Sequence, residues 1–168
     1  LFTRRMLTVD EIVDEYTRFL KELRNQNSTL KVLFTVSPIR HIRDGMHASQ
    51  LSKATLLLAI EQLQSIFPTT IFYFPSYEIM LDELRDYRFY ADDMLHPSPL
   101  AVNYLWERFS DVFFSDVTQK ILDECESIRK ALAHRPFHPD SEEHKRFLGQ
   151  IVLKIERLSL KYPYLEFE

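Results

Sequence analysis

Two short apolar segments, each followed by a proline, constrain the fold of this chain more than any other feature. Residues 30–36 and 69–74 are almost continuously apolar, and Pro38 and Pro75 come after them. Such segments are typical of strands buried on both faces in a parallel sheet. Between them, residues 50–66 have a helical pattern, so the sequence predicts a right-handed βαβ unit. Loops that leave the carboxyl ends of both strands then share the sheet edge where α/β folds bind ligands.

The predicted helices have recognisable starts. Thr8 and Glu11 form a capping box before an amphipathic helix that ends near Arg24. Ser98 is a suitable N-cap for a later helix, with Pro99 at its first position. In the helix between the strands, the residues expected to face inward are Leu51, Ala54, Leu57, Leu58 and Leu63.

The last third of the chain has a purely helical character. A long pattern over 112–132, with a break near Ser115, precedes a final helix over 141–161. We therefore expect an α/β core over residues 1–110 and a C-terminal helical hairpin, packed on that core, over residues 111–168.

Charge and composition exclude several classes of protein. The formal net charge is −4 and the sequence pI is about 5.9, with Lys and Arg dispersed, whereas a nucleic-acid-binding domain is usually basic. A single cysteine, Cys125, excludes an internal disulfide and a cysteine-based zinc site, and it lies on an apolar helix face. No apolar run approaches ~20 residues, so we expect no membrane span and a cytoplasmic protein. The chain begins with Leu1 rather than Met, so we expect its true start to lie upstream.

An acidic residue and a histidine precede the helix that starts near Ser98. The segment Asp93-Met-Leu-His96 is followed by Pro97, which holds His96 in an extended backbone region. In acyl transfer, a carboxylate accepts a hydrogen bond from one ring nitrogen and leaves the other free as a base. The alternative is that both side chains merely cap a turn.

The loop after the first strand carries Ser37, Arg40, His41 and Arg43. The cationic side chains could bind a substrate carboxylate or phosphate by charge-assisted hydrogen bonds; the alternative is a solvated loop. Ser37 could direct its hydroxyl at an oxyanion, or it could satisfy nearby backbone groups. Neither Ser37 nor Ser76 lies in a Gly-x-Ser-x-Gly elbow. No metal-binding spacing is present, so we expect neither a metal nor a cofactor.

Five segments are distinctive: Phe34-Thr-Val-Ser-Pro-Ile-Arg-His41, Leu51-Ser-Lys-Ala-Thr-Leu56, Tyr73-Phe-Pro-Ser-Tyr-Glu78, Asp82-Glu-Leu-Arg-Asp-Tyr-Arg-Phe-Tyr90 and Asp93-Met-Leu-His-Pro-Ser98. Together they resemble the GSCFA domain family, which is related to the SGNH (GDSL-like) hydrolases and best known from Bacteroidetes-type bacteria. The resemblance implies a three-layer, flavodoxin-like α/β fold and an esterase or acyl-hydrolase activity on a small-molecule or glycan ester. On the SGNH pattern, Asp93 and His96 match the Asp-x-x-His block that supplies two members of the triad.

Two family features are missing from this sequence. The Gly-Ser-Cys-Phe-Ala motif with the presumed nucleophilic serine is absent, and Thr35-Val-Ser-Pro38 stands where a Gly-x-Asn-Asp block would supply the oxyanion-hole Asn. We therefore expect the C-terminal part of a GSCFA domain, truncated at its N-terminal end, with the nucleophile upstream and no esterase activity of its own. The alternative is a non-catalytic saccharide- or anion-binding module that uses the Arg40-His41 loop.

The small number of predicted strands has a further consequence. Two strands are visible, whereas a doubly wound sheet of this kind needs about five. The strand over 30–36 would then expose an unpaired apolar edge, which favours a homo-oligomer through that edge or unusually short, covered strands.

Overall fold

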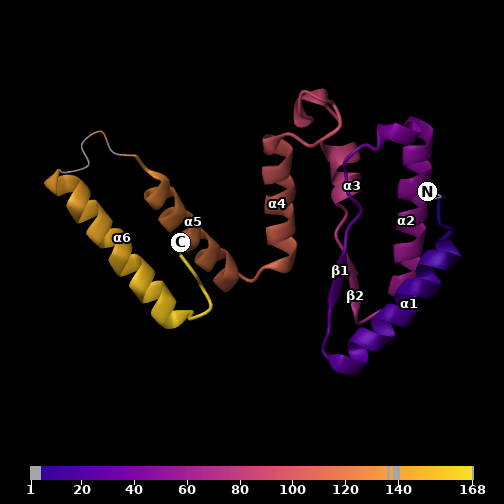
Figure 1. Ribbon diagram of the computed structural model, residues 1–168, viewed down its shortest axis with the longest axis horizontal. Coiled ribbons are helices and arrows are strands. Elements are labelled where there is room, and N and C mark those ends of the chain that lie inside the picture. Colours follow the sequence, from indigo (N-terminus) through magenta and orange to yellow (C-terminus); the bar gives the residue numbers. More distant parts are fainter. Residues whose placement is uncertain (1–4, 136, 138–140, 168) are drawn as a thin grey trace, which may run out of the picture. The chain divides into compact units, whose positions relative to one another are not determined.

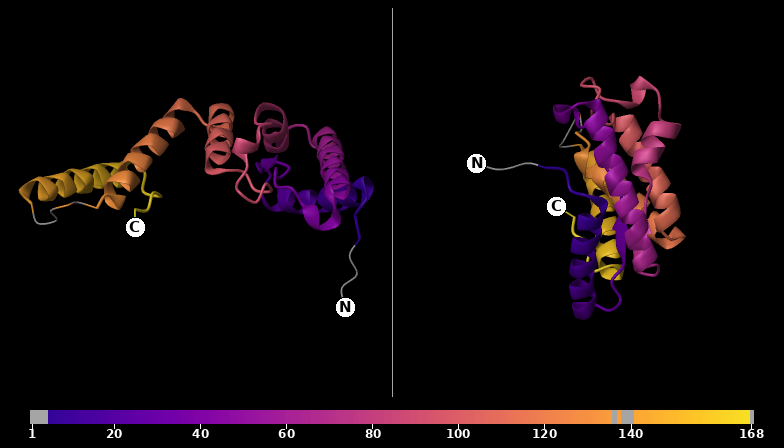
Figure 2. Two further views of the ribbon diagram at one scale, coloured as in Figure 1. Left: turned by 90° about the horizontal axis from the view of Figure 1, so that it is seen from above. Right: turned by 90° about the vertical axis from the view of Figure 1, so that its right-hand side faces the viewer.

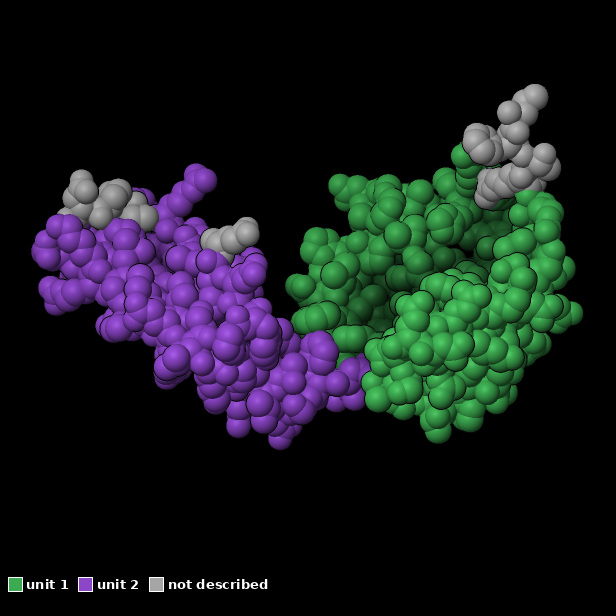
Figure 3. Space-filling view, turned by 60° about the horizontal axis from the view of Figure 1, so that its bottom comes forward, with its two compact units in different colours: residues 1–109 green, residues 110–168 purple. Residues whose placement is uncertain are grey.

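The computed structural model describes residues 5–135, 137 and 141–167. It is a mostly helical α/β structure with a small parallel sheet (Figure 1). The chain forms two compact units, residues 1–109 and residues 110–168 (Figure 3). The first unit contains the sheet, and the second is helical.

The sheet confirms the predicted parallel pair. β1 (Val32–Phe34) and β2 (Ile71–Tyr73) pair in parallel with Val32 opposite Ile71, and α2 (Met46–Ile66) connects them. Each strand is only three residues long, shorter than its apolar segment. The ladder is short because hydrogen bonds within the same chain segment take over beside β2, where the Thr70 N–H donates to the Phe67 carbonyl.

Helices α1 (Val9–Gln26) and α2 pack together against one face of the sheet. The predicted capping box is confirmed, because Thr8 Oγ1 accepts from the Glu11 N–H at 3.2 Å while the Glu11 carboxylate accepts from the Thr8 N–H at 2.8 Å. The buried cluster between these elements consists of Val13, Leu20, Ala59, Leu63, Phe67 and Ile71.

The inward face of α2 differs from the prediction. Leu51 and Leu58 are 47% and 58% exposed. The buried residues of the helix are Ser49, Lys53, Ala59, Ile60 and Leu63. The prediction was wrong because residues 56–60 are apolar on every side of the helix, so their periodicity does not fix which face turns inward.

The opposite face of the sheet is partly open, so the prediction of strands buried on both faces is wrong. Leu33 and Phe72 point to this side and are 38% and 41% exposed. Further along the face, Phe74 is buried and packs edge-to-face on Phe109 of α4 (Pro99–Phe113), with 5.2 Å between ring centroids. The helix α4 therefore covers the carboxyl end of β2 and leaves the start of that strand exposed.

Short turns that the sequence did not predict follow β2. A three-residue helix, α3 (Ser76–Glu78), continues into a π-helical turn over Ile79–Glu83. This segment buries Met80 completely and Leu84 almost completely, and it leads into the loop that carries His96.

The second unit is the predicted helical hairpin. α5 (Asp116–Ala133) and α6 (Glu142–Lys161) lie side by side, capped by Ser115 and Ser141 (Figure 1 and Figure 2). Their core consists of Ile128, Ile151 and Leu158, with partly buried neighbours that include Cys125. Within the described residues, no helix combines the length and the apolar character needed to cross a membrane.

Candidate active site at the carboxyl ends of the strands

Asp93 and His96 form a close pair. His96 Nδ1 lies 2.6 Å from Asp93 Oδ2, while Asp93 Oδ1 accepts hydrogen bonds from the backbone N–H groups of Leu95 at 2.9 Å and His96 at 3.0 Å. These backbone bonds, followed by the bond from the ring, lower the pKa of the Asp93 carboxyl from 3.8 to about 2. The carboxylate is therefore ionised at neutral pH and can hold a proton on Nδ1.

The turn that carries this pair has a well-defined backbone. Met94 has a φ of 59°, in the left-handed region, and its N–H donates to the Ala91 carbonyl at 2.9 Å. The Ala91 N–H donates to the His96 carbonyl at 2.8 Å, and Tyr90 and Pro97 form an isolated antiparallel bridge. The two ends of the turn are thus fixed to each other, with His96 between them.

The ring of His96 is open to solvent. The side chains of His96 and Asp93 are 57% and 44% exposed. His96 Nε2 forms no hydrogen bond with any part of the chain that the structure describes. This nitrogen is free to accept a proton from a reactant.

Arg40 brings the loop after β1 against this turn. Its backbone N–H donates to the Leu95 carbonyl at 3.2 Å, and its Nη1 donates to the Met94 carbonyl at 3.1 Å. Its guanidinium carbon lies 3.9 Å from the centre of the Tyr90 ring. The loop after β1 and the loop that ends at α4 therefore meet at the carboxyl end of the sheet (Figure 1).

Ser37 and His41, the other predicted binding residues, are exposed but make local contacts. Ser37 Oγ accepts from the Ile39 N–H at 3.3 Å, and the His41 backbone N–H donates to Ser49 Oγ at 3.2 Å. Neither side chain forms a hydrogen bond with the Asp93–His96 pair within the described residues. Their roles in substrate or oxyanion binding stay predictions.

A buried lysine at the same edge was not singled out from the sequence. Lys53 is 4% exposed, its Nζ donates to the Ser37 carbonyl at 2.5 Å, and it lies 5.8 Å from the centre of the Tyr77 ring. Burial lowers the pKa of its ammonium group. Ser49, Lys53 and Ile60 share one face of α2, and the structure shows that this face is the buried one.

The side chain of Ser76 has a structural role. It is buried, its Oγ donates to the Val36 carbonyl at 2.9 Å, and it lies 2.5 Å from Thr35 Oγ1. A hydroxyl in this setting joins the ends of β1 and β2.

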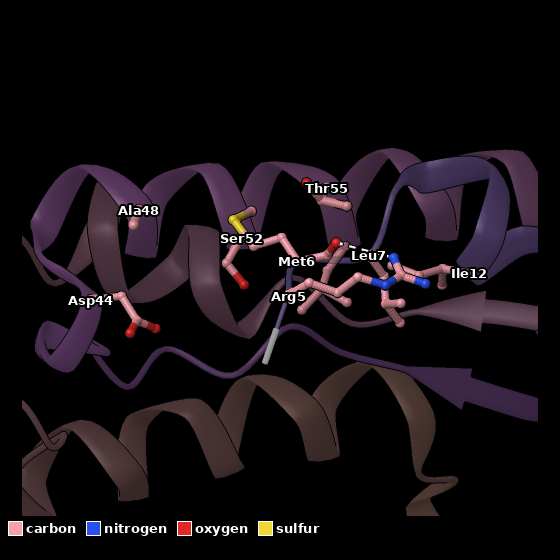
Figure 4. A pocket seen from close by; sticks show the side chains of 9 residues that line it. Arg5, Met6, Leu7, Ile12, Asp44, Ala48, Ser52 and Thr55 are labelled. Atoms are coloured by element: carbon pink, nitrogen blue, oxygen red, sulfur yellow. Dashed lines mark hydrogen bonds between the residues drawn. The ribbon is translucent and has the colours of Figure 1, made fainter. Parts of the chain in front are cut away.

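A cavity of about 430 Å³ lies between the N-terminal segment and α2 (Figure 4). It is lined by Arg5, Met6, Leu7, Ile12, Asp44, Ala48, Ser52, Thr55 and Leu56. Asp93 and His96 are not among its walls. Among residues 5–135, 137 and 141–167, no group of His, Cys, Asp and Glu side chains gathers as metal ligands would.

Comparisons with known proteins gave two matches. A family model described as "GSCFA family" matches residues 1–109, and one described as "GSCFA domain protein, C-terminal domain" matches residues 125–168. No curated protein and no solved structure matched.

Proposed function

The chain belongs to the GSCFA family, and from that membership we propose that it carries the base and the orienting acid of an SGNH-type ester hydrolase. The observation that supports this most is the 2.6 Å contact between His96 Nδ1 and Asp93 Oδ2, with Nε2 unengaged within the described part of the chain. The resemblance that the sequence suggests is thus confirmed at the level of the family, and the activity is our proposal.

In the proposed reaction, His96 Nε2 takes the proton from a serine hydroxyl as the serine oxygen forms a bond to the ester carbonyl carbon. The imidazolium then gives this proton to the leaving alcohol when the carbon–oxygen bond breaks. A water molecule then loses a proton to Nε2 as its oxygen forms a bond to the acyl carbon, and the imidazolium gives this proton to the serine oxygen as the acyl–serine bond breaks and the acid is released. Asp93 stays ionised throughout, because its backbone hydrogen bonds favour the charged form.

The serine and the remaining strands belong to the same proposal. We place the nucleophile in the Gly-Ser-Cys-Phe-Ala motif that names the family, which these 168 residues do not contain. In this proposal the full-length domain has a three-layer, flavodoxin-like fold, and β1 and β2 are two of several strands in its parallel sheet. Its substrate is a small-molecule or glycan ester, and the reaction needs no cofactor.

The test is ester hydrolysis by the full-length protein, with p-nitrophenyl acetate as the probe. We expect His96→Ala to lower kcat on the order of 10⁴-fold or more, as the loss of a triad member does. The matched control is His47→Ala, because the side chain of His47 is also exposed and forms no hydrogen bond in the described structure. Equal activity of His96→Ala and the wild type would contradict the proposal, and turnover by the 168-residue chain alone would place the nucleophile within it.

The competing proposal is a non-catalytic module that binds a saccharide or an anion through the Arg40-His41 loop. It is favoured by the guanidinium of Arg40, whose Nε and Nη2 form no hydrogen bond within the described residues. Absence of hydrolysis in every full-length preparation, together with binding that His96→Ala leaves intact, would favour the module.

A further inference from the structure

Arg40 and Asp93 hold opposite ends of the same two peptide groups. In the Met94–Leu95 peptide, the carbonyl accepts from Arg40 Nη1 and the N–H donates to Asp93 Oδ1. In the Leu95–His96 peptide, the carbonyl accepts from the Arg40 backbone N–H and the N–H donates to the same oxygen of Asp93. Two of the three peptide planes between the acid and the base are therefore fixed on both sides.

We propose that Arg40 is a positioning residue that aligns His96 with Asp93 by fixing these two peptide planes. The inference rests on the proposed function, since it assigns Arg40 a part in presenting the base rather than in contacting the substrate. It differs from the sequence-based expectation that Arg40 binds a substrate anion.

The backbone of the turn explains why such fixation matters. Met94 has a φ of 59°, a conformation that L residues with a side chain rarely adopt. Rotation about the N–Cα bond of Met94 would relieve it, but it would also displace the Met94–Leu95 peptide, and the Leu95 N–H would then leave Asp93 Oδ1. Freed on that side, the carboxylate could turn away from the ring of His96. The bond from Arg40 Nη1 to the Met94 carbonyl opposes this rotation.

Arg40 is itself held in place. Its guanidinium lies over the ring of Tyr90, a residue that pairs with Pro97 across the turn. The start of its loop is fixed by the bond from buried Lys53 to the Ser37 carbonyl. A planar guanidinium can stack on an aromatic ring and donate to a carbonyl at once, whereas the ammonium of a lysine cannot reproduce the stacked geometry.

The first experiment measures the turn in this chain by NMR, with Arg40→Gln and Arg40→Lys. Arg43→Gln is the matched control, because Arg43 lies in the same loop, is exposed and forms no hydrogen bond in the described structure. We expect Arg40→Gln to mix the two ring tautomers of His96 and to speed amide exchange of Leu95 and His96 by about tenfold or more. Unchanged exchange in α2 and β2 excludes a general loss of structure. Wild-type ring shifts and protection in Arg40→Gln would overturn the proposal.

The second experiment measures hydrolysis by the full-length protein. A misplaced base lowers the rate of the chemical step, so we expect Arg40→Gln to lower kcat by about 10²-fold with KM within about threefold and Arg40→Lys to be intermediate. The activity control is Arg24→Gln, an exposed arginine on α1 outside the candidate site, which we expect to leave kcat unchanged. A raised KM for anionic esters alone, with kcat intact, would make Arg40 an anion-binding residue and overturn the inference. If the wild-type protein hydrolyses no ester, the proposed function fails, while the NMR result still decides the role of Arg40.

Discussion

Asp93 uses one oxygen for the ring of His96, at 2.6 Å, and the other for the backbone N–H of the same residue, at 3.0 Å. The ring and the backbone of the histidine are thus oriented by a single carboxylate. Such an arrangement fixes the position of Nε2 relative to the sheet edge. In the proposed reaction, this is the nitrogen that exchanges the proton with the serine and the leaving group.

Asp93→Asn tests the orienting role. The amide oxygen of an Asn side chain can still accept hydrogen bonds from the two backbone N–H groups, but its NH₂ group then faces Nδ1 of His96. This contact favours the tautomer with the proton on Nε2, and a protonated Nε2 cannot act as a base. For the proposed hydrolysis, we expect kcat of the full-length protein to fall by about 10³- to 10⁴-fold. Asp92→Asn is the control, because Asp92 is exposed and forms no hydrogen bond among the described residues. Equal kcat values for the two variants would remove Asp93 from the mechanism.

Because the pKa of Asp93 is lowered in the folded state, the stability of the protein should depend on pH in a way that can be tested. Its carboxyl has a folded pKa of about 2 and an ordinary value of 3.8, so the unfolded state takes up the proton first as the pH falls. The contribution of Asp93 to stability is fully present above pH 3.8 and is lost as the pH falls through about 2. Carboxyl ¹³C shifts should place its titration near the lower value.

The pH dependence of unfolding checks the same point. Glu11 and Glu126 also have pKa values lowered to about 2, by hydrogen bonds from Arg5 and Arg129 respectively. The stability that the wild-type protein loses at low pH is therefore the sum of contributions from all three carboxyl groups. Asp93→Asn keeps those two contributions, and the difference between the proteins isolates Asp93. A titration of Asp93 at its ordinary value would show that the turn does not form these bonds in solution.

Truncation of one buried side chain in each unit tests whether the units unfold independently. Leu63 lies in the cluster between α1, α2 and β2, and Ile128 lies in the cluster between α5 and α6. We expect Leu63→Ala and Ile128→Ala each to cost about 2–5 kcal/mol, because each opens a cavity. Hydrogen exchange should rise only in the unit that carries the change. A uniform loss of protection along the chain in both variants would indicate one cooperative unit.

The unpaired outer edge of β1 leads us to expect that the chain self-associates. β1 pairs with β2 alone in the described structure, so the N–H and C=O of Leu33 point away from any strand partner. We expect light scattering to show a mass that rises with protein concentration and that Leu33→Lys keeps monomeric. Leu58→Lys is the control, since Leu58 is an exposed leucine on α2. A monomer at every concentration would mean that strands of three residues are too short to recruit a partner.

Local sequence signals predicted much of this fold. The capping box at Thr8, the break at Ser115 and the parallel pairing of the two apolar segments all follow from short-range patterns, and the structure contains each of them. The proximity of Asp93 to His96 is local too, because the two residues lie three positions apart in the sequence.

The remaining features depend on long-range contacts. Arg40 meets Met94 across 54 positions, and no spacing rule connects a loop after one strand with a turn after the next. Lys53 resembles an ordinary surface lysine in sequence, and its burial follows from the orientation of α2, which the apolar residues 56–60 leave undetermined. Tertiary packing decides both features.

In the proposed site, Asp93 fixes His96 with its proton on Nδ1 and leaves Nε2 as a base. The most direct measurement is the ¹⁵N spectrum of the His96 ring in this chain, at a pH where the ring is neutral. We predict a protonated Nδ1 and an unprotonated Nε2, and in Asp93→Asn the reverse tautomer or a mixture. A wild-type ring that carries its proton on Nε2, or that averages between tautomers as an unconstrained histidine does, would contradict the account.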